Sequence, residues 1–396
     1  MFAVLTPIRK SGARLLALAS VLWLAACEPI SLGGGIAAGG GPNINPSDPV
    51  PVALLVPRGS GNQSDEFLAN SLENAARLAI SDLDGVMIDL RVYATAGTAG
   101  NAQTAAAQAV ADGAKIILGP VFGEAANAAG HAAAAKGVNV LSFSNNPTIA
   151  GGNVFVLGPT FVNTADRLAG YATRQGKNRI LVVHSQNVAG ELGSRAIQQA
   201  IARNGATMAG TVSYEFSQQG VVDAVPRIKS AASAGQANAV FLTANTAGAL
   251  PLFAQMLPEA GLSNASMQYI GLTRWDIPAQ TLDLPGVQGG WFAMPDPGKA
   301  RAFSARFNAA YGAKPHPIAT LGYDGIAAIG ALVKSGKSNA LTGAALTQGA
   351  GFQGATGIFR LRPDGTNERG LAVAQIRNKQ VVVIDPAPGS FGGAGF

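Results

Sequence analysis

The order of apolar and polar residues predicts an α/β protein made of two doubly wound parallel-sheet lobes. Short continuous apolar runs of strand length recur along the chain, and between them lie segments whose apolar residues are spaced as on a helix. The same alternation begins a second time near residue 179. Without residues 1–50 and 387–396 the chain keeps roughly 335 residues, which is enough for two lobes that each bury a core.

The first lobe is predicted to begin with the apolar run "PVALLVP" at 51–57, which is typical of a parallel strand buried on both faces. Residues 63–85 carry apolar side chains at helical spacing, and Gly85 is a suitable helix stop. Four strands separated by helices within about 95 residues indicate one doubly wound sheet. The remaining strands of this lobe are expected at 87–95, 115–120 and 138–144, and the remaining helices at 101–112 and 123–137.

The second lobe repeats the pattern, and the chain then ends in further helices and antiparallel strands. Ligands of open parallel sheets sit beyond the carboxyl ends of the strands, so two such lobes predict a common cleft. The final segment, 357–385, reads as three antiparallel strands with turns at Asp364-Gly365 and Asn378-Lys379. The second-lobe strands are expected at 179–185, 207–214, 238–245 and 267–273, its helices at 190–204, 219–235 and 246–258, and the later helices at 299–312, 319–336 and 340–348.

Residues 1–27 are predicted to be a lipoprotein signal peptide. Three basic residues precede an apolar run at 15–26 that is too short to span a bilayer. The following "LAAC" resembles the bacterial lipoprotein signal, in which Cys27 is lipidated and becomes the mature N-terminus. The alternative is an ordinary signal peptide with an incidental cysteine. A lipidated Cys27 would hold the protein in the periplasm, and Glu28 in place of Asp favours the outer membrane over the inner membrane.

Both ends of the mature chain are predicted to lack regular structure. Residues 28–50 are rich in Gly, Pro, Asn and Ser and read as a flexible tether, and 387–396 read as a disordered tail. The formal net charge is +6, but three basic residues and no acidic one lie in the signal. The mature chain therefore has 25 basic and 22 acidic residues, and its scattered basic residues lack the stacking aromatics of a nucleic-acid site.

The motifs that usually carry catalysis are missing from the sequence. "GALVKSGKS" (330–338) has the wrong glycine spacing for a phosphate loop, and "PRGSGNQS" (57–64) lacks the third glycine of a dinucleotide fingerprint. The three histidines form no local metal motif, and no nucleophile elbow is present. We therefore expect a protein that is not an enzyme and that holds no metal or cofactor. His316, which lies between two prolines, is expected to be structural, whereas His184 ends a strand at the cleft.

Four stretches carry a family resemblance: "VALLVPRGSGNQSDEFLANSLENAARLAI", "IILGPVFGEAANAA", "VNVLSFSNNP" and "FVLGPTFVNTADRLAGYATRQGKNRILVV". In this order they resemble the type I periplasmic binding proteins, the fold of the leucine-binding proteins, and the resemblance runs from about 51 to 385. It implies three hinge crossings between the lobes, near 155–160, 285–295 and 350–358. The N-terminal lobe would then comprise 51–157 and about 290–350, and the C-terminal lobe 158–289 and about 351–386.

Within this fold two functions are implied by resemblance. "LLVPRGSG", "ILGPVFGEAANAA", "LDLPGVQGGWFAMPDP" and "GATGIFRLRPDGTNERGLAVAQI" resemble the penicillin-binding protein activators, lipoproteins that dock to a peptidoglycan synthase and stimulate peptidoglycan synthesis. This is the main hypothesis. The alternative is the solute-binding component of a branched-chain amino-acid ABC transporter, whose partners would be a permease and a small amino-acid ligand.

The turns at the strand ends bear on the ligand. Helix N-termini bind carboxylates, but the turn at 121–124 has no hydroxyl, and Glu124 puts like charge there. Arg274 and Asp276 either read the two charges of a zwitterion or pair with each other as a salt bridge that closes the cleft. The predicted cleft residues are Arg58, Ser60, Phe122, Gly123, Ser144, Asn145, Asn146, His184, Asn245, Thr246, Arg274, Trp275 and Asp276.

Overall fold

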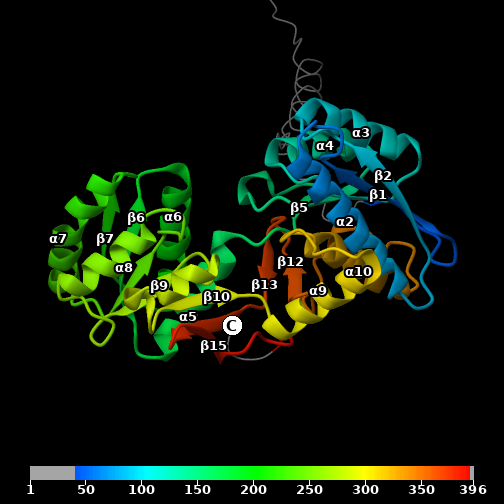
Figure 1. Ribbon diagram of the computed structural model, residues 1–396. Coiled ribbons are helices and arrows are strands. Elements are labelled where there is room, and N and C mark those ends of the chain that lie inside the picture. Colours follow the sequence, from blue (N-terminus) through cyan, green and yellow to red (C-terminus); the bar gives the residue numbers. More distant parts are fainter. Residues whose placement is uncertain (1–40, 393–396) are drawn as a thin grey trace, which may run out of the picture. The chain divides into compact units, whose positions relative to one another are not determined.

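The computed structural model describes residues 41–392, and its two large sheets confirm the predicted α/β fold with two lobes (Figure 1). We call the five-stranded sheet with its helices the first lobe and the seven-stranded sheet with its helices the second lobe. The predicted signal peptide and its lipidation site, Cys27, lie outside the described residues. None of the helices within 41–392 has both the length and the apolar character that a bilayer crossing requires.

The first sheet is entirely parallel, with strand order β2-β1-β3-β4-β5. The four strands predicted for it are present, and a short fifth strand, β5, joins its edge. The sequence predicts no strand for β5, because its short apolar run adjoins the first implied hinge crossing near 155–160. The strands are β1 (Val50–Val56), β2 (Ile88–Ala94), β3 (Ile116–Leu118), β4 (Asn139–Ser142) and β5 (Val154–Val156).

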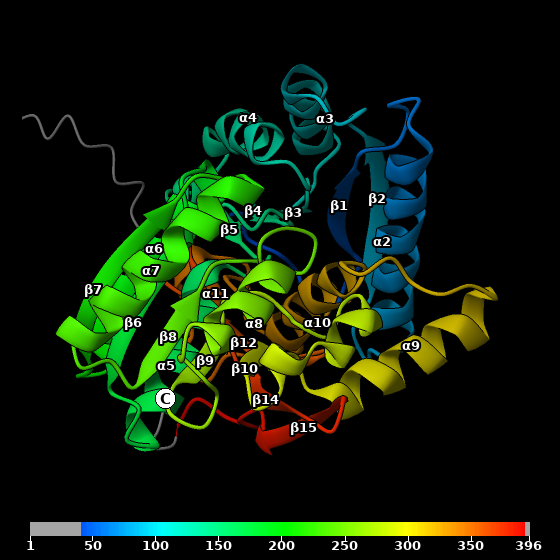
Figure 2. The ribbon, with the colours of Figure 1, turned by 60° about the vertical axis from the view of Figure 1, so that its left-hand side comes forward.

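Helices cover both faces of the first sheet. Alternate residues of β1 divide between two cores: Leu54 packs in the core under α2 and α10, whereas Leu55 packs in the core under α3 and α4. Both views show α3 beside α4 and α2 beside α10 (Figures 1 and 2). The helices are α2 (Gln63–Ser81), α3 (Ala99–Ala111), α4 (Gly123–Ala134), α9 (Pro297–Tyr311), α10 (Thr320–Lys334), the short α11 (Gly343–Leu346) and the 3₁₀ turn η1 (Pro147–Ile149).

The second sheet has the order β15-β14-β10-β9-β8-β6-β7, and its antiparallel pairings are those of β14 with β10 and with β15. Helices α5 and α6 cover one face, and α7 and α8 cover the other. The strands are β6 (Arg179–Ser185), β7 (Thr207–Tyr214), β8 (Ala239–Leu242), β9 (Gln268–Gly271), β10 (Trp291–Met294), β14 (Ala372–Arg377) and β15 (Gln380–Asp385). The helices are α5 (Phe161–Arg174), α6 (Val188–Arg203), α7 (Gln218–Ala234) and α8 (Leu250–Glu259), with 3₁₀ turns η2 (Ala279–Asp283) and η3 (Pro285–Val287).

A third sheet is formed by residues that stand in the sequence between α11 and β14. The strands predicted for the C-terminal segment 357–385 are therefore divided between this sheet and the second sheet. The third sheet contains β11 (Phe352–Gly354), β12 (Gly357–Leu361) and β13 (Asn367–Arg369), all antiparallel. Phe352, Phe359 and Leu361 pack in the same core as α10, so this part of the predicted C-terminal lobe belongs to the first lobe. The middle strand predicted within 357–385 is thus two strands, β13 and β14, in different sheets.

One of the three implied hinge crossings differs in position from the structure. The first crossing lies between β5 and α5. At the second, β10 pairs with β9 and β14, so the chain leaves the second lobe after Met294, which is within the implied 285–295 but beyond the implied lobe boundary at about 290. At the third, the chain enters the second sheet near Gly370 and not at 350–358. The reason is that sheet membership depends on hydrogen-bonded partners far away in sequence.

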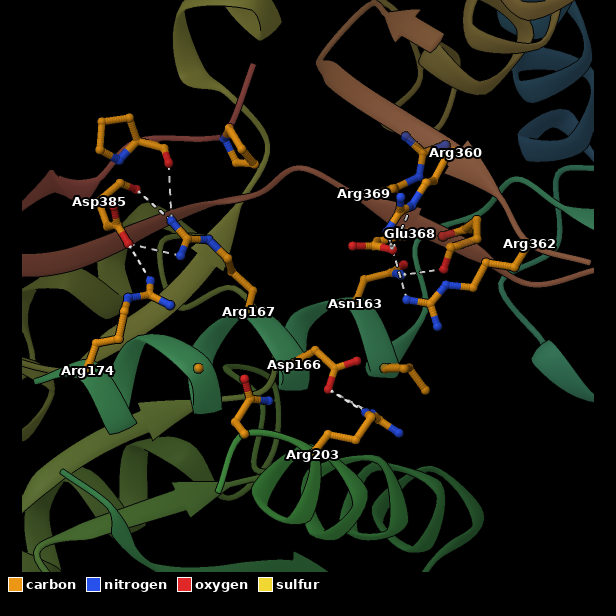
Figure 3. A pocket seen from close by; sticks show the side chains of 16 residues that line it. Asn163, Asp166, Arg167, Arg174, Arg203, Arg360, Arg362, Glu368, Arg369 and Asp385 are labelled. Atoms are coloured by element: carbon orange, nitrogen blue, oxygen red, sulfur yellow. Dashed lines mark hydrogen bonds and ion pairs between the residues drawn. The ribbon is translucent and has the colours of Figure 1, made fainter. Parts of the chain in front are cut away.

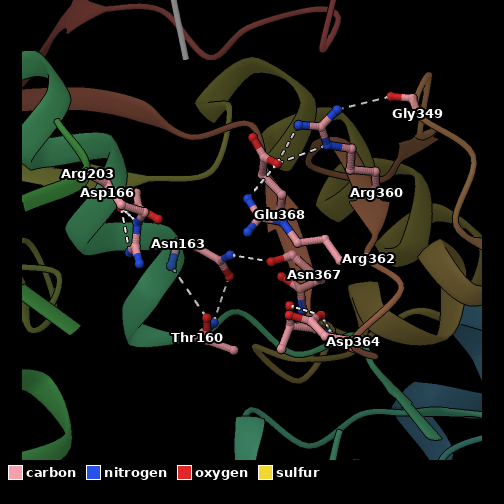
Figure 4. A network of polar contacts seen from close by, with 11 residues as sticks. Thr160, Asn163, Asp166, Arg203, Gly349, Arg360, Arg362, Asp364, Asn367 and Glu368 are labelled. Carbon is pink, nitrogen blue, oxygen red and sulfur yellow. Dashed lines mark hydrogen bonds and ion pairs between the residues drawn. The ribbon is translucent and has the colours of Figure 1, made fainter. Parts of the chain in front are cut away.

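Polar side chains tie β13 to the first crossing (Figure 4). The Asn367 amide donates to the carbonyl oxygens of Val156 and Gly158, both at 2.8 Å. The Asn163 amide donates to the Asn367 carbonyl at 3.0 Å, while Thr160 and Asn163 form a capping box at the start of α5. The crossing strands are thus held to one another by buried amides.

The described parts of the two predicted unstructured ends contain no helix or strand before Val50 or after Asp385, but they contact the lobes. Near the start, Ile44 is buried in the first core, and its N–H donates to the Ser338 carbonyl at 2.9 Å. Near the end, Ala387 packs against the second-lobe core, and the Gly389 carbonyl accepts from Gln353 at 3.1 Å. Both segments lack the periodicity of a helix or strand, which is why composition alone assigned them to the tether and the tail.

Candidate ligand-binding site

The polar side chains that follow β1 form hydrogen bonds and ion pairs within their own turn and with α2. The Arg58 guanidinium donates to Glu73 and to the Asn70 amide oxygen, both at 2.8 Å, and so lies along α2. The Ser60 hydroxyl accepts from the Asn62 N–H at 3.1 Å, and Asn62 in turn caps α2. These two predicted cleft residues therefore stabilise the turn in which they lie.

The next two strand ends are neighbours in the structure. A Cβ added to Gly123 would lie 3.4 Å from the side-chain amide nitrogen of Asn146, so the turns after β3 and β4 lie side by side. Phe122 is 41% exposed and precedes α4 without a side-chain cap, and Glu124 occupies the first turn of that helix. The positive end of α4 thus already carries a carboxylate, which disfavours a second one there.

The turn after β4 is built from its own hydrogen bonds. The Ser144 hydroxyl is buried and accepts from the Asn146 N–H at 3.1 Å. The Asn146 side chain accepts from the N–H and hydroxyl of Thr148 and so caps the turn η1. Asn145 is exposed between them. Of these three predicted residues, Asn145 thus has the most exposed side chain.

The second-lobe strand ends also contact their own lobe. His184 is buried, and its Nδ1 lies 3.2 Å from the Ser185 carbonyl oxygen and 3.5 Å from a Glu191 carboxylate oxygen. The Thr246 hydroxyl donates to the Ile277 carbonyl at 2.6 Å, and Asn245 is exposed beside it. His184 and Thr246 are therefore held by neighbours within the lobe.

Trp275 differs from the sequence-based expectation. We expected it to face the cleft, but its side chain is fully buried in the second-lobe core. A Cβ at Gly271 or Gly290 would lie 2.3 Å and 2.4 Å from the indole ring, so these two glycines form the slot that receives it. On either side of Trp275, Arg274 and Asp276 pair with each other, with Nε 2.9 Å from Oδ1, which was one of the two predicted arrangements.

A cavity of about 250 Å³ lies next to this ion pair and is the candidate ligand site. Arg274 is the predicted cleft residue that lines it. The other walls come from the segment before α10, from α9 and from the crossing segments, so the cavity is assembled from parts far apart in sequence. Its lining includes His316, Phe303, Ile318, Leu321 and Thr356.

His316 is a lining residue that sequence reasoning assigned to a purely structural role. Its ring packs edge-on against Phe67, with 5.7 Å between the centroids, and its Nδ1 accepts from the Ile318 N–H at 3.3 Å. Burial lowers the pKa of His316 below its ordinary value of 6.5, so the ring is neutral at neutral pH. The flanking prolines indicate a rigid loop, but they do not show which distant residues form the rest of the cavity wall.

The lowered pKa of His316 predicts an acid-sensitive stability. The unfolded chain takes up a proton near pH 6.5, whereas the folded ring resists protonation until lower pH. The free energy of unfolding should therefore fall as the pH drops below about 6.5. His316→Gln should flatten this part of a urea-unfolding series measured at several pH values. The exposed His131→Gln serves as the control, and an unchanged slope in His316→Gln would contradict the assignment.

The described residues contain no group of three His, Cys, Asp or Glu side chains that could hold a metal ion. The cavity also lacks an acid and a base placed on a common reacting atom. Arg274 is paired with Asp276, and the His316 Nδ1 accepts a hydrogen bond from the backbone. The arrangement suits reversible binding of a small molecule with an apolar part and a polar group.

Similar proteins of known structure identify the fold of the chain. No curated protein matches the chain. Among solved structures, it is similar to a putative branched-chain amino acid ABC transporter protein from Rhodospirillum rubrum, with 19% identity, a TM-score of 0.72, and coverage of 85% of this chain and 100% of that one. A branched chain amino acid ABC transporter periplasmic ligand-binding protein from Burkholderia xenovorans has 18% identity, a TM-score of 0.66 and coverage of 87% and 97%.

A third similar structure is an ABC transporter substrate-binding protein from Desulfitobacterium hafniense in complex with Leu, with 18% identity, a TM-score of 0.59 and coverage of 85% and 100%. These likenesses confirm the type I fold of the leucine-binding proteins. The family model of the periplasmic binding proteins matches residues 49–380, which is nearly all of the two lobes. The chain therefore belongs to the periplasmic binding protein family.

Proposed function

We propose that the chain is the solute-binding component of an ABC transporter and delivers a small amino-acid-like ligand to a permease. The observation that carries this proposal is the cavity beside Arg274, which combines a guanidinium and a neutral imidazole with apolar walls. The similar protein from Desulfitobacterium hafniense is in complex with Leu, a molecule with the same combination of an apolar body and charged groups.

The contacts of the cavity favour a ligand whose carboxylate binds Arg274. The positive end of α4 already carries Glu124, whereas Arg274, which donates to both oxygens of Asp276 through Nε and one Nη, keeps the N–H groups of its other Nη for a ligand. Phe303, Ile318 and Leu321 offer apolar surface for an aliphatic side chain. The volume of about 250 Å³ limits the ligand to a small solute.

Arg274→Ala should weaken binding of the preferred amino acid by tenfold or more, because a charge-assisted fork to a carboxylate is lost. Thermal unfolding of the full chain with an amino-acid panel identifies the ligand, which at a hundred times its dissociation constant should add about 2.7 kcal/mol. Calorimetric titration then compares Arg274→Ala with Arg301→Ala, an exposed arginine on α9 that does not line the cavity. Equal affinities in the two variants would place the ligand elsewhere.

The same proposal includes a periplasmic location with a lipid anchor at Cys27, and the outer membrane is favoured because Glu28 follows it. The support is the "LAAC" pattern and the membership of a periplasmic family. Mass spectrometry of the mature N-terminal peptide tests the anchor. A peptide that starts at residue 27 without acyl chains would refute it.

A second function, activation of a penicillin-binding protein, is favoured by a specific observation. Arg58, His184 and Thr246 at the strand ends all contact their own lobe, as expected for a cleft that is not specialised for a ligand. The sequence motifs that resemble the activators point in the same direction. In this role the chain would dock to a peptidoglycan synthase and stimulate it. Retention of a bifunctional synthase on the immobilised full chain, together with no amino-acid binding, would put this function first.

A further inference from the structure

A second cavity, of about 620 Å³, lies against α5, α6 and the β12–β13 hairpin (Figure 3). Its lining contains six arginines and three carboxylates, a formal excess of three positive charges. Ligand cavities in proteins commonly have volumes of about 300–1,000 Å³, so this one has the size of a small-molecule site. The arginines are Arg167, Arg174, Arg203, Arg360, Arg362 and Arg369.

The excess charge sits in two clusters in which two arginines share one carboxylate. Asp385 lies 2.9 Å from Arg167 and 3.0 Å from Arg174. Glu368 lies 2.7 Å from Arg360 and 2.9 Å from Arg362 (Figure 4). Each cluster therefore carries one uncompensated positive charge. Arg369 adds none, because it pairs with Asp324 outside the cavity.

The arginines differ in how many of their donors are used. Arg167 donates to Leu371, Asp385 and Pro386 and is mostly buried, so it holds the chain together. Arg362 is 43% exposed and, among the described residues, donates only through one Nη to Glu368. Its remaining N–H groups are available to a ligand.

Arg203 is the second arginine with a donor to spare. It donates to one oxygen of Asp166 through Nε at 3.0 Å and one Nη at 2.7 Å, and its other Nη has no partner within residues 41–392. Burial raises the pKa of Asp166 even though Arg203 opposes this, and Arg362 and Glu368 also act on it. The Asp166 carboxylate thus lies near Arg203 and Arg362, the arginines that an anionic ligand would contact.

We propose that this cavity binds a small oxyanion of the phosphate class with two or more negative charges, held by Arg203 and Arg362. The lining has excess positive charge, Arg362 belongs to one of the two clusters that carry it, Arg203 has an Nη without a partner among the described residues, and guanidinium forks fit phosphate oxygens in pairs. The site is separate from the cavity beside Arg274, with Arg369 lining both. It does not depend on which solute the other cavity takes.

Calorimetric titration of the full chain with inorganic phosphate and with pyrophosphate tests the proposal, and sulfate and succinate serve as comparison anions. Pyrophosphate should bind, and added salt should weaken it. Arg362→Ala and Arg203→Ala should each reduce the affinity by tenfold or more. Arg195→Ala, an exposed arginine on α6 outside the cavity, should leave it unchanged.

Asp166→Asn distinguishes a ligand site from a network that only ties elements together. If the cavity binds an anion, removing the competing carboxylate should raise the pyrophosphate affinity several-fold. Arg203→Lys keeps the charge and loses the fork, and it should bind weakly while circular dichroism shows an intact fold. The proposal is overturned if pyrophosphate does not bind at about 1 mM. It is equally overturned if Arg362→Ala binds as the unchanged chain does, or if succinate alone binds.

Discussion

Replacing Arg369 with Met should lower the free energy of unfolding by about 3–5 kcal/mol, which is the usual cost of leaving a buried charge without its partner. Arg369 lies 2.9 Å from Asp324, whose side chain is fully buried and also accepts from the Ala355 N–H at 2.8 Å. Arg369 additionally donates to the Leu157 carbonyl at the first crossing. Urea unfolding followed by circular dichroism measures the loss.

The pH dependence of this loss identifies its cause. Burial raises the pKa of Asp324, and Arg369 opposes that rise, so the variant should raise it further. A raised folded-state pKa stabilises the protein at low pH and ceases to do so as the pH rises through it. The deficit of Arg369→Met should therefore grow from acid to neutral pH. Arg306→Ala breaks an exposed pair with Asp82 and should cost less than about 1 kcal/mol; an equal loss in both variants would contradict the prediction.

Replacing Trp275 with Ala should lower the free energy of unfolding by about 3–5 kcal/mol, as for other large aromatic residues removed from a core. The indole is fully buried between Gly271 and Gly290, so the variant leaves a cavity that the sheet cannot easily fill. Its Nε1 has no hydrogen-bond partner among the described residues, so the loss comes from packing alone. Denaturant unfolding measured by circular dichroism gives the value.

Phe216→Ala is the matched control for this prediction. Phe216 is 60% exposed and lies at another strand end of the same lobe. Its removal should change stability by no more than about 0.5 kcal/mol. If Trp275→Ala were as mild as Phe216→Ala, the side chain would face solvent, as the sequence had led us to expect.

Local patterns were sufficient to predict most elements of the fold. The continuous apolar runs at 52–56 and 180–183 lie within β1 and β6, because a strand covered on both faces needs apolar residues at every position. The predicted turn at Asn378-Lys379 is confirmed, since it joins β14 to β15 and both residues adopt the positive φ of a tight hairpin turn. These features depend only on neighbours in the chain.

The directions of the strand-end side chains could not be predicted in this way. Whether Trp275 faces the cleft or the core depends on a slot that Gly290 completes from another strand. Whether Arg58 is free for a ligand depends on Glu73, a residue of α2 that forms an ion pair with it. A periodic pattern assigns residues to elements, but it does not say which distant group occupies the space beside a loop residue.

The sequence by itself determined the fold class, the two-lobe organisation and the positions of most strands and helices, because periodicity and turn chemistry are local. Only the tertiary structure decided which residues form the cavities. It places Arg274 and His316 in the wall of one cavity. It places six arginines from α5, α6 and the C-terminal strands in the wall of another, together with three carboxylates. Burial and ion pairing are set by contacts between segments far apart in the chain, and no local pattern records them.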